Sequence, residues 1–316
     1  MLNHTRAWVV VPNWNGSDFI GNCLKSLEAQ TVEANIVVVD NGSVDDSIRL
    51  IEASFPGVTL LKQDKNYGFA GGVNIGIRHA IEKSAQYIAL FNNDAVANEK
   101  WLEKLVACAE ESDCIGIVTG KLMHSDRKHY DSTAECYSKW GYPYPRDRDK
   151  KDVGQREARE EVFAATGGAS LYTVRMLEDI GMFDERFFAY YEDVDISFRA
   201  QLYGWKVAYE PTAVAYHKTS STSSKLGDFT RYHATKNFFI LYHKNMPGYL
   251  YFKYLPLHIL YSLRLLSSSL IRGKILVWIK AFFAFIKLSP KIIKDRRHIQ
   301  SQKKVTDKYI EGWLQQ

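Results

Sequence analysis

The architecture of this chain can be inferred from residues 7–40, which read AWVVVPNWNGSDFIGNCLKSLEAQTVEANIVVVD. The segment opens with a wholly apolar run, 7–12, and closes with a second one, 35–39, followed by Asp40. Short apolar runs without polar alternation are typical of strands buried on both faces. Between the two runs, residues 18–30 carry apolar side chains at helical spacing. We therefore predict a strand, a helix and a second, parallel strand.

The same alternation continues through much of the chain. It predicts strands at 58–62, 87–91, 115–119 and 207–216. It also predicts a helix that begins near Asp45 and Asp46, and two further helices at 73–84 and 100–111. Strands that alternate with helices favour an α/β fold, here a Rossmann-like, mostly parallel central sheet flanked by helices. Residues 124–161 are polar, and we predict a long loop or small excursion there, which would suit a mobile lid on the acceptor side.

The charge distribution divides the 316 residues in two. Residues 1–228 hold 25 Lys and Arg against 33 Asp and Glu, whereas residues 229–316 hold 16 against 3. We predict an acidic α/β body, 1–228, and a basic helical extension, 229–316. The apolar stretches 249–271 and 275–288 are interrupted by basic residues, as in amphipathic helices that lie on an anionic membrane. The alternative is a helical subdomain that packs on the body or on a second copy in a homodimer.

The cysteines and the N-terminus bear on the compartment. Cys23, Cys108, Cys114 and Cys136 form no CxxC pair, and no long apolar run precedes the first predicted strand. We expect no signal peptide, free thiols and a reducing, cytoplasmic location.

Three polar positions follow predicted strands: Asp40, Asn66 and Asp94. Ligands of open α/β sheets bind beyond the carboxyl ends of the strands, so we expect these residues to share one crevice. NYGFAGGVNIG at 66–76 places three glycines before a predicted helix, which suits a diphosphate, although it is not a P-loop. The carboxylate that ends Asn92-Asn93-Asp94 suits Mg²⁺ or Mn²⁺. Each motif taken alone is also compatible with an ordinary turn.

The densest group of acids lies at 183–199 and is framed by aromatic residues. A helix that begins near Glu192 would pair Asp195 with Arg199 at i, i+4 and make Asp195 a structural acid. Glu192 and Asp193 would then face the crevice, where one of them can accept a proton from a hydroxyl group.

Four segments together resemble family 2 glycosyltransferases of the GT-A fold, most closely the rhamnosyltransferase branch of bacterial polysaccharide and O-antigen biosynthesis. They are NYGFAGGVNIG (66–76), NND (92–94), TGGASLYTVRMLEDIGMFDERFFAYYEDVDISFR (166–199) and the histidine at 217. The resemblance covers roughly residues 6–220 and implies that 1–228 is a nucleotide-sugar glycosyltransferase domain.

The resemblance also implies roles for individual residues. Asp193 matches the catalytic base, beside Glu192; Asp94 matches the metal-binding Asp of the family's DxD motif, and His217 a histidine that completes the metal site. Asn92 replaces the first acid of DxD, which leaves strict metal dependence open. Gly167, Gly168 and Tyr191 would line the acceptor side. The donor would contact Pro12, Asn15, Asp40, Asn41, Asn66, Gly71, Gly72, Asn74, Asn92 and Asn93, with Asp40 binding its nucleobase.

The implied activity is an inverting transfer of L-rhamnose from dTDP-β-L-rhamnose to a saccharide acceptor. We expect the acceptor to be lipid-linked, the cation to be Mg²⁺ or Mn²⁺, and the enzyme to lie at the inner face of the plasma membrane. The alternatives are a UDP-galactofuranose, UDP-glucose or UDP-N-acetylglucosamine donor, or a nucleotide-sugar-binding protein without turnover. The acidic body and the lack of a recognised nucleic-acid module argue against nucleic-acid binding.

Overall fold

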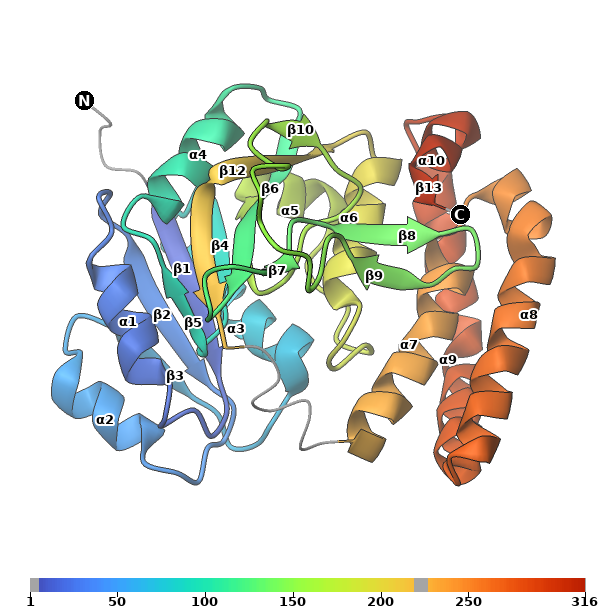
Figure 1. Cartoon of the computed structure of the whole chain (residues 1–316), viewed down its shortest axis with the longest axis horizontal. Coiled ribbons are helices and arrows are strands. Elements are labelled where there is room, and N and C mark those ends of the chain that lie inside the picture. The colour runs from blue at the N-terminus through green and yellow to red at the C-terminus, as the bar shows by residue number, and fades with distance from the viewer. Residues whose placement is uncertain (1–5, 219–226, 316) are drawn as a thin grey trace.

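The computed structural model describes residues 6–218 and 227–315 of the chain (Figure 1). The expected lack of a signal peptide rests partly on residues 1–5, which lie outside the described residues. The α/β body and the helical extension are both present, as predicted.

A mixed, mostly parallel sheet forms the centre of the body. Its main strands are β1 (Ala7–Asn13), β2 (Asn35–Asp40), β3 (Thr59–Lys62), β4 (Tyr87–Phe91), β6 (Ile115–His124), β11 (Ala169–Thr173) and β12 (Lys206–His217). The path through the sheet is β10-β12-β6-β11-β4-β1-β2-β3, with β10 at Glu160–Glu161. In this path β11 runs antiparallel to both of its neighbours, while β12 is parallel to β6.

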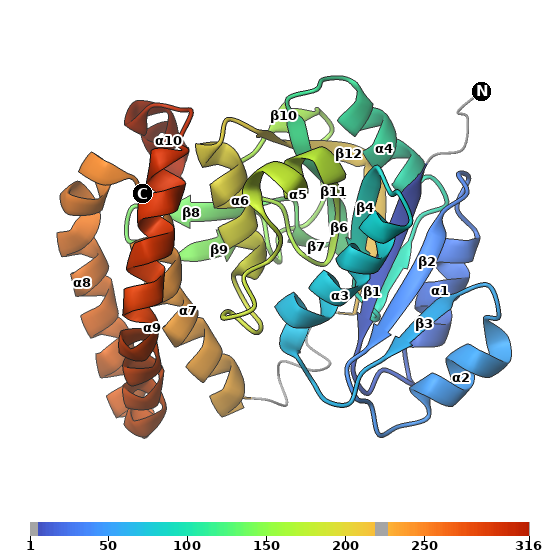
Figure 2. The ribbon, with the colours of Figure 1, turned by 180° about the vertical axis from the view of Figure 1, so that it is seen from behind.

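Helices cover both faces of this sheet. They are α1 (Ile20–Glu28), α2 (Ser47–Ser54), α3 (Gly68–Glu82), α4 (Trp101–Glu110), α5 (Val174–Ile180) and α6 (Glu192–Leu202). The alternation of side chains along β1 explains the two layers, because successive residues of a strand point to opposite faces. Val9 and Val11 belong to the cluster that contains α1 and α4, whereas Val10 packs with α3. Figure 2 shows α3 and α5 in front of the sheet.

The segment 124–161, predicted as a long loop or small excursion, is mostly irregular but includes short strands. It contains β7 (Tyr130–Ser132), β8 (Glu135–Ser138) and β9 (Pro143–Pro145), and β8 also pairs with β13 (Leu314–Gln315) near the C-terminus. Charged side chains hold the segment together. Asp147 is buried and accepts hydrogen bonds from Arg156 (2.7 Å) and Thr133 (3.0 Å). Hydropathy cannot reveal such strands, since their polar groups satisfy one another.

The extension consists of α7 (Gly227–Asn245), α8 (Gly248–Ile271), α9 (Ile275–Ser301) and α10 (Asp307–Trp313). Helix α9 runs through Pro290 and continues 13 residues beyond the apolar stretch 275–288. No helix within residues 6–218 and 227–315 combines the length and apolar character that crossing a bilayer requires.

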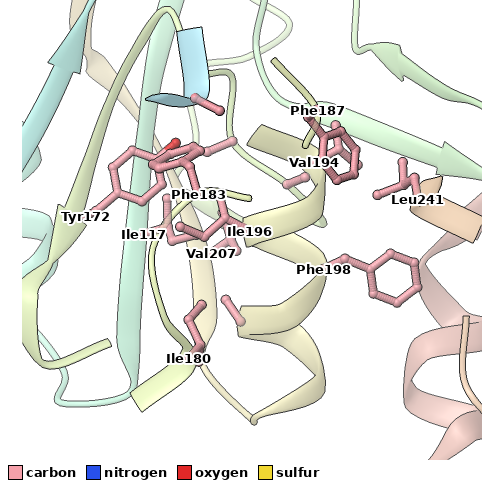
Figure 3. Close-up of a cluster of buried hydrophobic side chains, with 14 of the residues drawn as sticks. Ile117, Tyr172, Ile180, Phe183, Phe187, Val194, Ile196, Phe198, Val207 and Leu241 are labelled. Carbon is pink, nitrogen blue, oxygen red and sulfur yellow. The ribbon is translucent and has the colours of Figure 1, made fainter. Parts of the chain in front are cut away.

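Helix α7 is fastened to the body through a buried charge cluster. Asp195 of α6 is fully buried and accepts hydrogen bonds from Arg199 (3.0 Å), Lys244 (2.9 Å) and Asn245 (2.8 Å). The predicted pairing of Asp195 with Arg199 is confirmed. Figure 3 shows the apolar part of this contact, where Phe198 of α6 lies near Leu241 of α7. Removing one partner of a buried ion pair typically costs about 3–5 kcal/mol, so this cluster is a strong link between the two parts.

Candidate active site

A cavity of about 670 Å³ opens where β1, β2 and β4 end. This is the carboxyl edge of the parallel strands, as the sequence predicts. Of the predicted site residues, the cavity is lined by Pro12, Asn41, Asn66, Asn92, Asn93, Asp94, Gly167, Gly168, Tyr191, Glu192, Asp193 and His217. Segments more than 200 residues apart in the sequence thus meet at one site.

The first turn of α6 presents two adjacent acids, Glu192 and Asp193, to this cavity. Asp193 accepts hydrogen bonds from the backbone N–H groups of Gly167 and Val194, both at 2.8 Å. Burial raises the pKa of Asp193 above its ordinary value, although the backbone donors oppose the shift by stabilising the charged form. A carboxylate with a raised pKa is a better proton acceptor than an ordinary aspartate.

Glu192 lies in a different environment. Its side chain is buried, and its Oε2 has no hydrogen-bond partner among the described residues. Burial raises the pKa of Glu192 well above its ordinary value, and the negative charge of Asp193 raises it further. Burial thus disfavours the charged form of Glu192 more strongly than that of Asp193, whose carboxylate is stabilised by two backbone N–H donors.

The loop before α6 is backbone-strained. Phe188, Tyr190 and Tyr191 have φ angles of 66°, 73° and 70°, the left-handed region that bulky residues avoid. Such a residue costs about 1–3 kcal/mol and persists only where its surroundings impose it. Asn237 of α7 supplies that restraint, because its side-chain amide donates to the carbonyls of Phe187 (3.0 Å), Ala189 (2.8 Å) and Tyr190 (2.7 Å).

On the opposite wall, His217 at the end of β12 joins two carboxylates. Its Nε2 lies 2.9 Å from Asp94 Oδ1, and its Nδ1 lies 2.6 Å from Asp131 Oδ2. Burial alone would lower the pKa of His217, but the hydrogen bonds to Asp131 and Asp94 outweigh it and raise the pKa to about 9. Asp131 is itself buried and also bonded to Arg148 at 2.6 Å.

Asp94 and His217 lie side by side in the cavity and bond each other directly, at 2.9 Å. A metal-bound histidine usually donates its second ring N–H to a carboxylate, as Nδ1 of His217 does to Asp131. No cluster of three or more His, Cys, Asp or Glu side chains with metal-binding geometry occurs in the described part of the chain. One carboxylate and one imidazole would suit a hard cation only if a phosphorylated substrate and water supplied its remaining ligands.

Gly167 and Gly168 connect the two walls. Gly167 N–H donates to Asp193, and the carbonyl of Gly168 accepts a hydrogen bond from the Asn92 N–H at 2.9 Å. A Cβ at Gly167 would lie 3.3 Å from the Asp193 side chain, and one at Gly168 would lie 3.2 Å from Asn92. The absence of side chains allows both groups to sit this close.

Five predicted donor contacts do not line the cavity: Asn15, Asp40, Gly71, Gly72 and Asn74. Asp40 is fully buried behind the wall and accepts hydrogen bonds from Asn13 (2.9 Å) and Ser43 (2.6 Å). Asn15 accepts a hydrogen bond from the Val44 N–H at 2.9 Å, which shapes the adjoining loop. The structure therefore places these two polar side chains as supports of the cavity wall.

The glycine-rich motif differs from its prediction. Gly71 and Gly72 lie inside α3, which begins at Gly68 rather than near residue 73, so they form no loop before the helix. Both are buried, and a Cβ at Gly72 would lie 2.5 Å from the Asn41 side chain. Asn74 faces away from the cavity and donates to the carbonyl of Phe183 at 2.8 Å. Glycine here allows α3 to pack closely, a role that local turn statistics do not reveal.

Sequence reasoning missed several cavity residues in the polar segment, above all Asp131, Glu135 and Arg148. Burial raises the pKa of Glu135 well above its ordinary value, and the charge of Asp193 adds to the effect. The density of charged residues between 124 and 161 was the only signal, and it does not distinguish a site from a solvated loop. The cavity also contains Trp14, Phe69, Thr166, Phe188, Tyr190 and Phe229.

Comparison with known proteins places this geometry in context. The sequence model of glycosyl transferase family 2 matches residues 8–181. The dTDP-rhamnosyl transferase RfbF of Shigella flexneri is 28% identical over 238 residues, which cover 70% of this chain and 77% of that protein. An N-acetylglucosaminyl-diphospho-decaprenol L-rhamnosyltransferase of Mycobacterium tuberculosis is 26% identical over 235 residues, covering 68% and 76%.

Solved structures share the fold at low identity. The mannosyltransferase PcManGT of Pyrobaculum calidifontis, in complex with GDP-Man and Mn²⁺, superposes with a TM-score of 0.56 at 16% identity, covering 95% of this chain and 86% of that one. TarS of S. aureus, residues 1–349 in complex with UDP-GlcNAc, also gives 0.56 at 16% identity, covering 98% and 93%. The predicted GT-A fold is thereby confirmed.

Proposed function

The chain belongs to glycosyltransferase family 2, and on that premise we propose that it transfers L-rhamnose from dTDP-β-L-rhamnose to a lipid-linked saccharide, with inversion at the anomeric carbon. The observation that carries the proposal is the Gly167–Gly168 bridge. Its Gly167 N–H donates to the Asp193 carboxylate and its Gly168 carbonyl accepts from the Asn92 N–H, so that Asp193 and the Asn92–Asp94 segment border one cavity. In an in-line displacement, the acceptor is activated on one side of the donor sugar and the leaving group is stabilised on the other side.

Asp193 acts as the general base in this proposal. Its carboxylate takes the proton of an acceptor hydroxyl as the hydroxyl oxygen forms a bond to the anomeric carbon and the bond from that carbon to the diphosphate breaks. Single displacement inverts the configuration, so a β-linked donor gives an α-linked rhamnoside. Burial raises the pKa of Glu192 and of Glu135 well above its ordinary value, which favours Asp193 as the charged acid beside the acceptor.

In this proposal, Asp94 and His217 lie on the side of the cavity from which the diphosphate departs. A divalent cation bound by them supplies positive charge against the diphosphate that leaves. Mg²⁺ and Mn²⁺ both suit such oxygen-rich surroundings. Asp131 keeps Nε2 of His217 directed at Asp94 by bonding Nδ1, and Asn92 presents its amide 3.4 Å from the same Nε2.

The choice of donor rests on relatives that transfer rhamnose and match about 70% of the chain. A galactofuranosyltransferase, GlfT1 of Mycobacterium tuberculosis, is 34% identical but over only 33% of this chain. We therefore place dTDP-rhamnose before UDP-galactofuranose, UDP-glucose and UDP-N-acetylglucosamine. The lipid-linked acceptor follows from the decaprenyl diphosphate named for the mycobacterial relative.

The extension supports a location at the inner face of the plasma membrane. Exposed apolar side chains lie along α8 at Phe252, Ile259, Leu260, Leu263, Leu270 and Ile271, and along α9 at Leu276, Ile279, Phe283, Ile286 and Ile293. Basic residues such as Lys280 and Lys287 stand beside this stripe. Apolar and cationic groups together favour an anionic lipid surface; self-association through the same stripe, giving a homodimer, is the competing outcome.

A donor-binding screen tests the proposal. Thermal stability would be measured with dTDP-rhamnose and a panel of UDP-sugars, each with Mg²⁺, Mn²⁺ or chelator, for wild type, Asp94→Ala and the control Asp149→Ala, an exposed aspartate outside the cavity. We expect dTDP-rhamnose to stabilise wild type and Asp149→Ala, and to lose its effect with chelator or in Asp94→Ala. Stabilisation by a UDP-sugar alone would overturn the rhamnose assignment, and no response to any nucleotide sugar would overturn the proposal.

A further inference from the structure

A second depression, of about 640 Å³, lies between the β8–β9 hairpin and α8. It is lined by Ser138, Trp140, Tyr142, Tyr144, Leu260, Tyr261, Leu263, Arg264 and Ser267. Figure 1 shows the hairpin reaching from the body toward the extension at this point. We call this depression the hairpin groove, and we propose that it binds the isoprenoid diphosphate part of the acceptor lipid. The inference rests on the proposed function.

The groove is an assembled feature of the fold. The tip of the hairpin is seated against α8, because the Trp140 carbonyl accepts a hydrogen bond from His258 Nδ1 at 3.1 Å. Gly141, at φ 78°, approaches so closely that a Cβ there would lie 2.7 Å from the Tyr242 ring. The aromatic wall of the groove and its helical wall are thus held in a fixed relation.

An aromatic path joins the groove to the active-site cavity. Tyr191, which lines the cavity next to Glu192, has its ring centroid 6.3 Å from that of Tyr142. Tyr142 lies in turn 5.1 Å from Tyr261 of α8. These ring contacts place the groove beside the active-site cavity, so that a long acceptor whose sugar lies near Asp193 has the groove as its neighbouring surface.

The chemistry of the groove fits an isoprenoid diphosphate. Among the described residues that line it none bears a carboxylate, while Arg264 contributes a guanidinium 5.7 Å from the Tyr261 ring. An anionic diphosphate therefore meets a cation and no opposing charge. Leu260, Leu263 and the tyrosine rings offer the apolar contact that isoprene units require.

The groove also continues into the exposed stripe of α8. Leu260 and Leu263, which are 55% and 51% exposed, belong to the groove and to the stripe at once. If the stripe rests on a bilayer, a lipid chain can pass from the membrane into the groove along one helix. This continuity favours a lipid over a soluble saccharide chain as the occupant.

The test measures binding of farnesyl diphosphate, a soluble isoprenoid diphosphate, to the full-length protein by isothermal titration. Leu263→Glu alters the groove, and Leu270→Glu is the matched control, the same substitution at a more exposed position two turns further along α8. We expect wild type and Leu270→Glu to bind alike, and Leu263→Glu to bind about tenfold more weakly or worse, since it places a carboxylate against an anion and removes apolar contact. Arg264→Gln should abolish the preference for farnesyl diphosphate over farnesol while leaving the fold intact.

Several results would overturn the assignment. They are no binding to wild type, equal binding to Leu263→Glu, or displacement by dihexanoyl phosphatidylglycerol as effective as by unlabelled farnesyl diphosphate, which would make the occupant a membrane phospholipid. The donor screen on the same variants separates this idea from the proposed function. Retained stabilisation by dTDP-rhamnose without farnesyl diphosphate binding would refute the groove alone, and farnesyl diphosphate binding without any nucleotide-sugar response would refute the transferase proposal alone.

Discussion

Asp131 Oδ2 lies 2.6 Å from His217 Nδ1. This contact determines which ring nitrogen of His217 faces Asp94, and it comes from a strand, β7, in the segment that the sequence presents as a loop. Asp131 is almost fully buried, so it has little role at the surface. We infer that its carboxylate orients His217 and increases the basicity of the ring.

Replacing Asp131 by Asn should therefore weaken cation binding. The amide cannot accept the Nδ1 proton as a carboxylate does, and loss of such a partner typically lowers metal affinity about 10–100-fold. Titration of Mn²⁺ in the presence of dTDP, followed by electron paramagnetic resonance, measures the change. Asp126→Asn is the control, because Asp126 makes the same 2.6 Å contact with the exposed His129, away from the cavity. Unchanged Mn²⁺ affinity in Asp131→Asn would contradict the assigned role.

Neutral replacements of Asp193 and of Glu192 should have different effects on the turnover rate. Asp193→Asn removes the proposed base, and kcat should fall about 10²–10⁴-fold with donor binding preserved. Glu192→Gln resembles the protonated acid that burial already favours, so most activity should remain. The kcat of each variant is measured from the rate of dTDP release in the presence of dTDP-rhamnose and a saccharide acceptor. An equal loss of kcat in the two variants would show that Asp193 is not the general base.

The sequence predicts well wherever one local pattern has one structural meaning. The apolar runs at 7–12 and 35–39 became β1 and β2, and the helix expected near Glu192 begins at that residue. Pairing at i, i+4 sufficed for Asp195 and Arg199. These features depend on near neighbours along the chain, which is why periodicity and spacing reveal them.

The remaining features depend on contacts across the chain. Asp131 reaches His217 from 86 residues away, and Asn237 bonds the loop at Phe187 from 50 residues away. Gly72 lies in a helix instead of a phosphate loop because α3 packs against Asn41, which no local pattern records. A polar residue that is satisfied by a distant polar residue has the same sequence signature as one satisfied by water.

Asn237 provides a test of the link between the extension and the active site. Its amide bonds three carbonyls of the strained loop before α6, so Asn237→Ala removes the restraint on Tyr190 and Tyr191. We expect a loss of about 1–3 kcal/mol in the free energy of unfolding together with a lower kcat. Denaturant unfolding and initial rates measure the two effects. Asn22→Ala, an exposed change on α1, should affect neither, and a variant of Asn237 with full kcat would show that the loop holds its shape unaided.

The contact between α7 and α8 should make stability sensitive to acid. Burial lowers the pKa of His258 to about 3 and that of His243, which lies 5.6 Å away, to about 4. His258 stacks between Tyr242 and Phe238 at 4.0 and 4.2 Å, with little room for a charge. A depressed folded-state pKa means that the unfolded chain takes up the proton first. The stability is therefore complete above the unfolded value near 6.5 and is lost as the pH falls toward the folded values.

Each such histidine contributes a slope of up to about 1.4 kcal/mol per pH unit in that window. His258→Phe keeps an aromatic ring in the stack and removes the titrating group, so its stability should fall less steeply than that of wild type between pH 6 and pH 5, by about 1 kcal/mol per unit. Urea unfolding at several pH values gives both slopes, and buried carboxylates such as Asp195 contribute equally to each protein. Parallel slopes for the two proteins would mean that His258 does not take up its proton on unfolding in this range, and the acid sensitivity of the extension would have another origin.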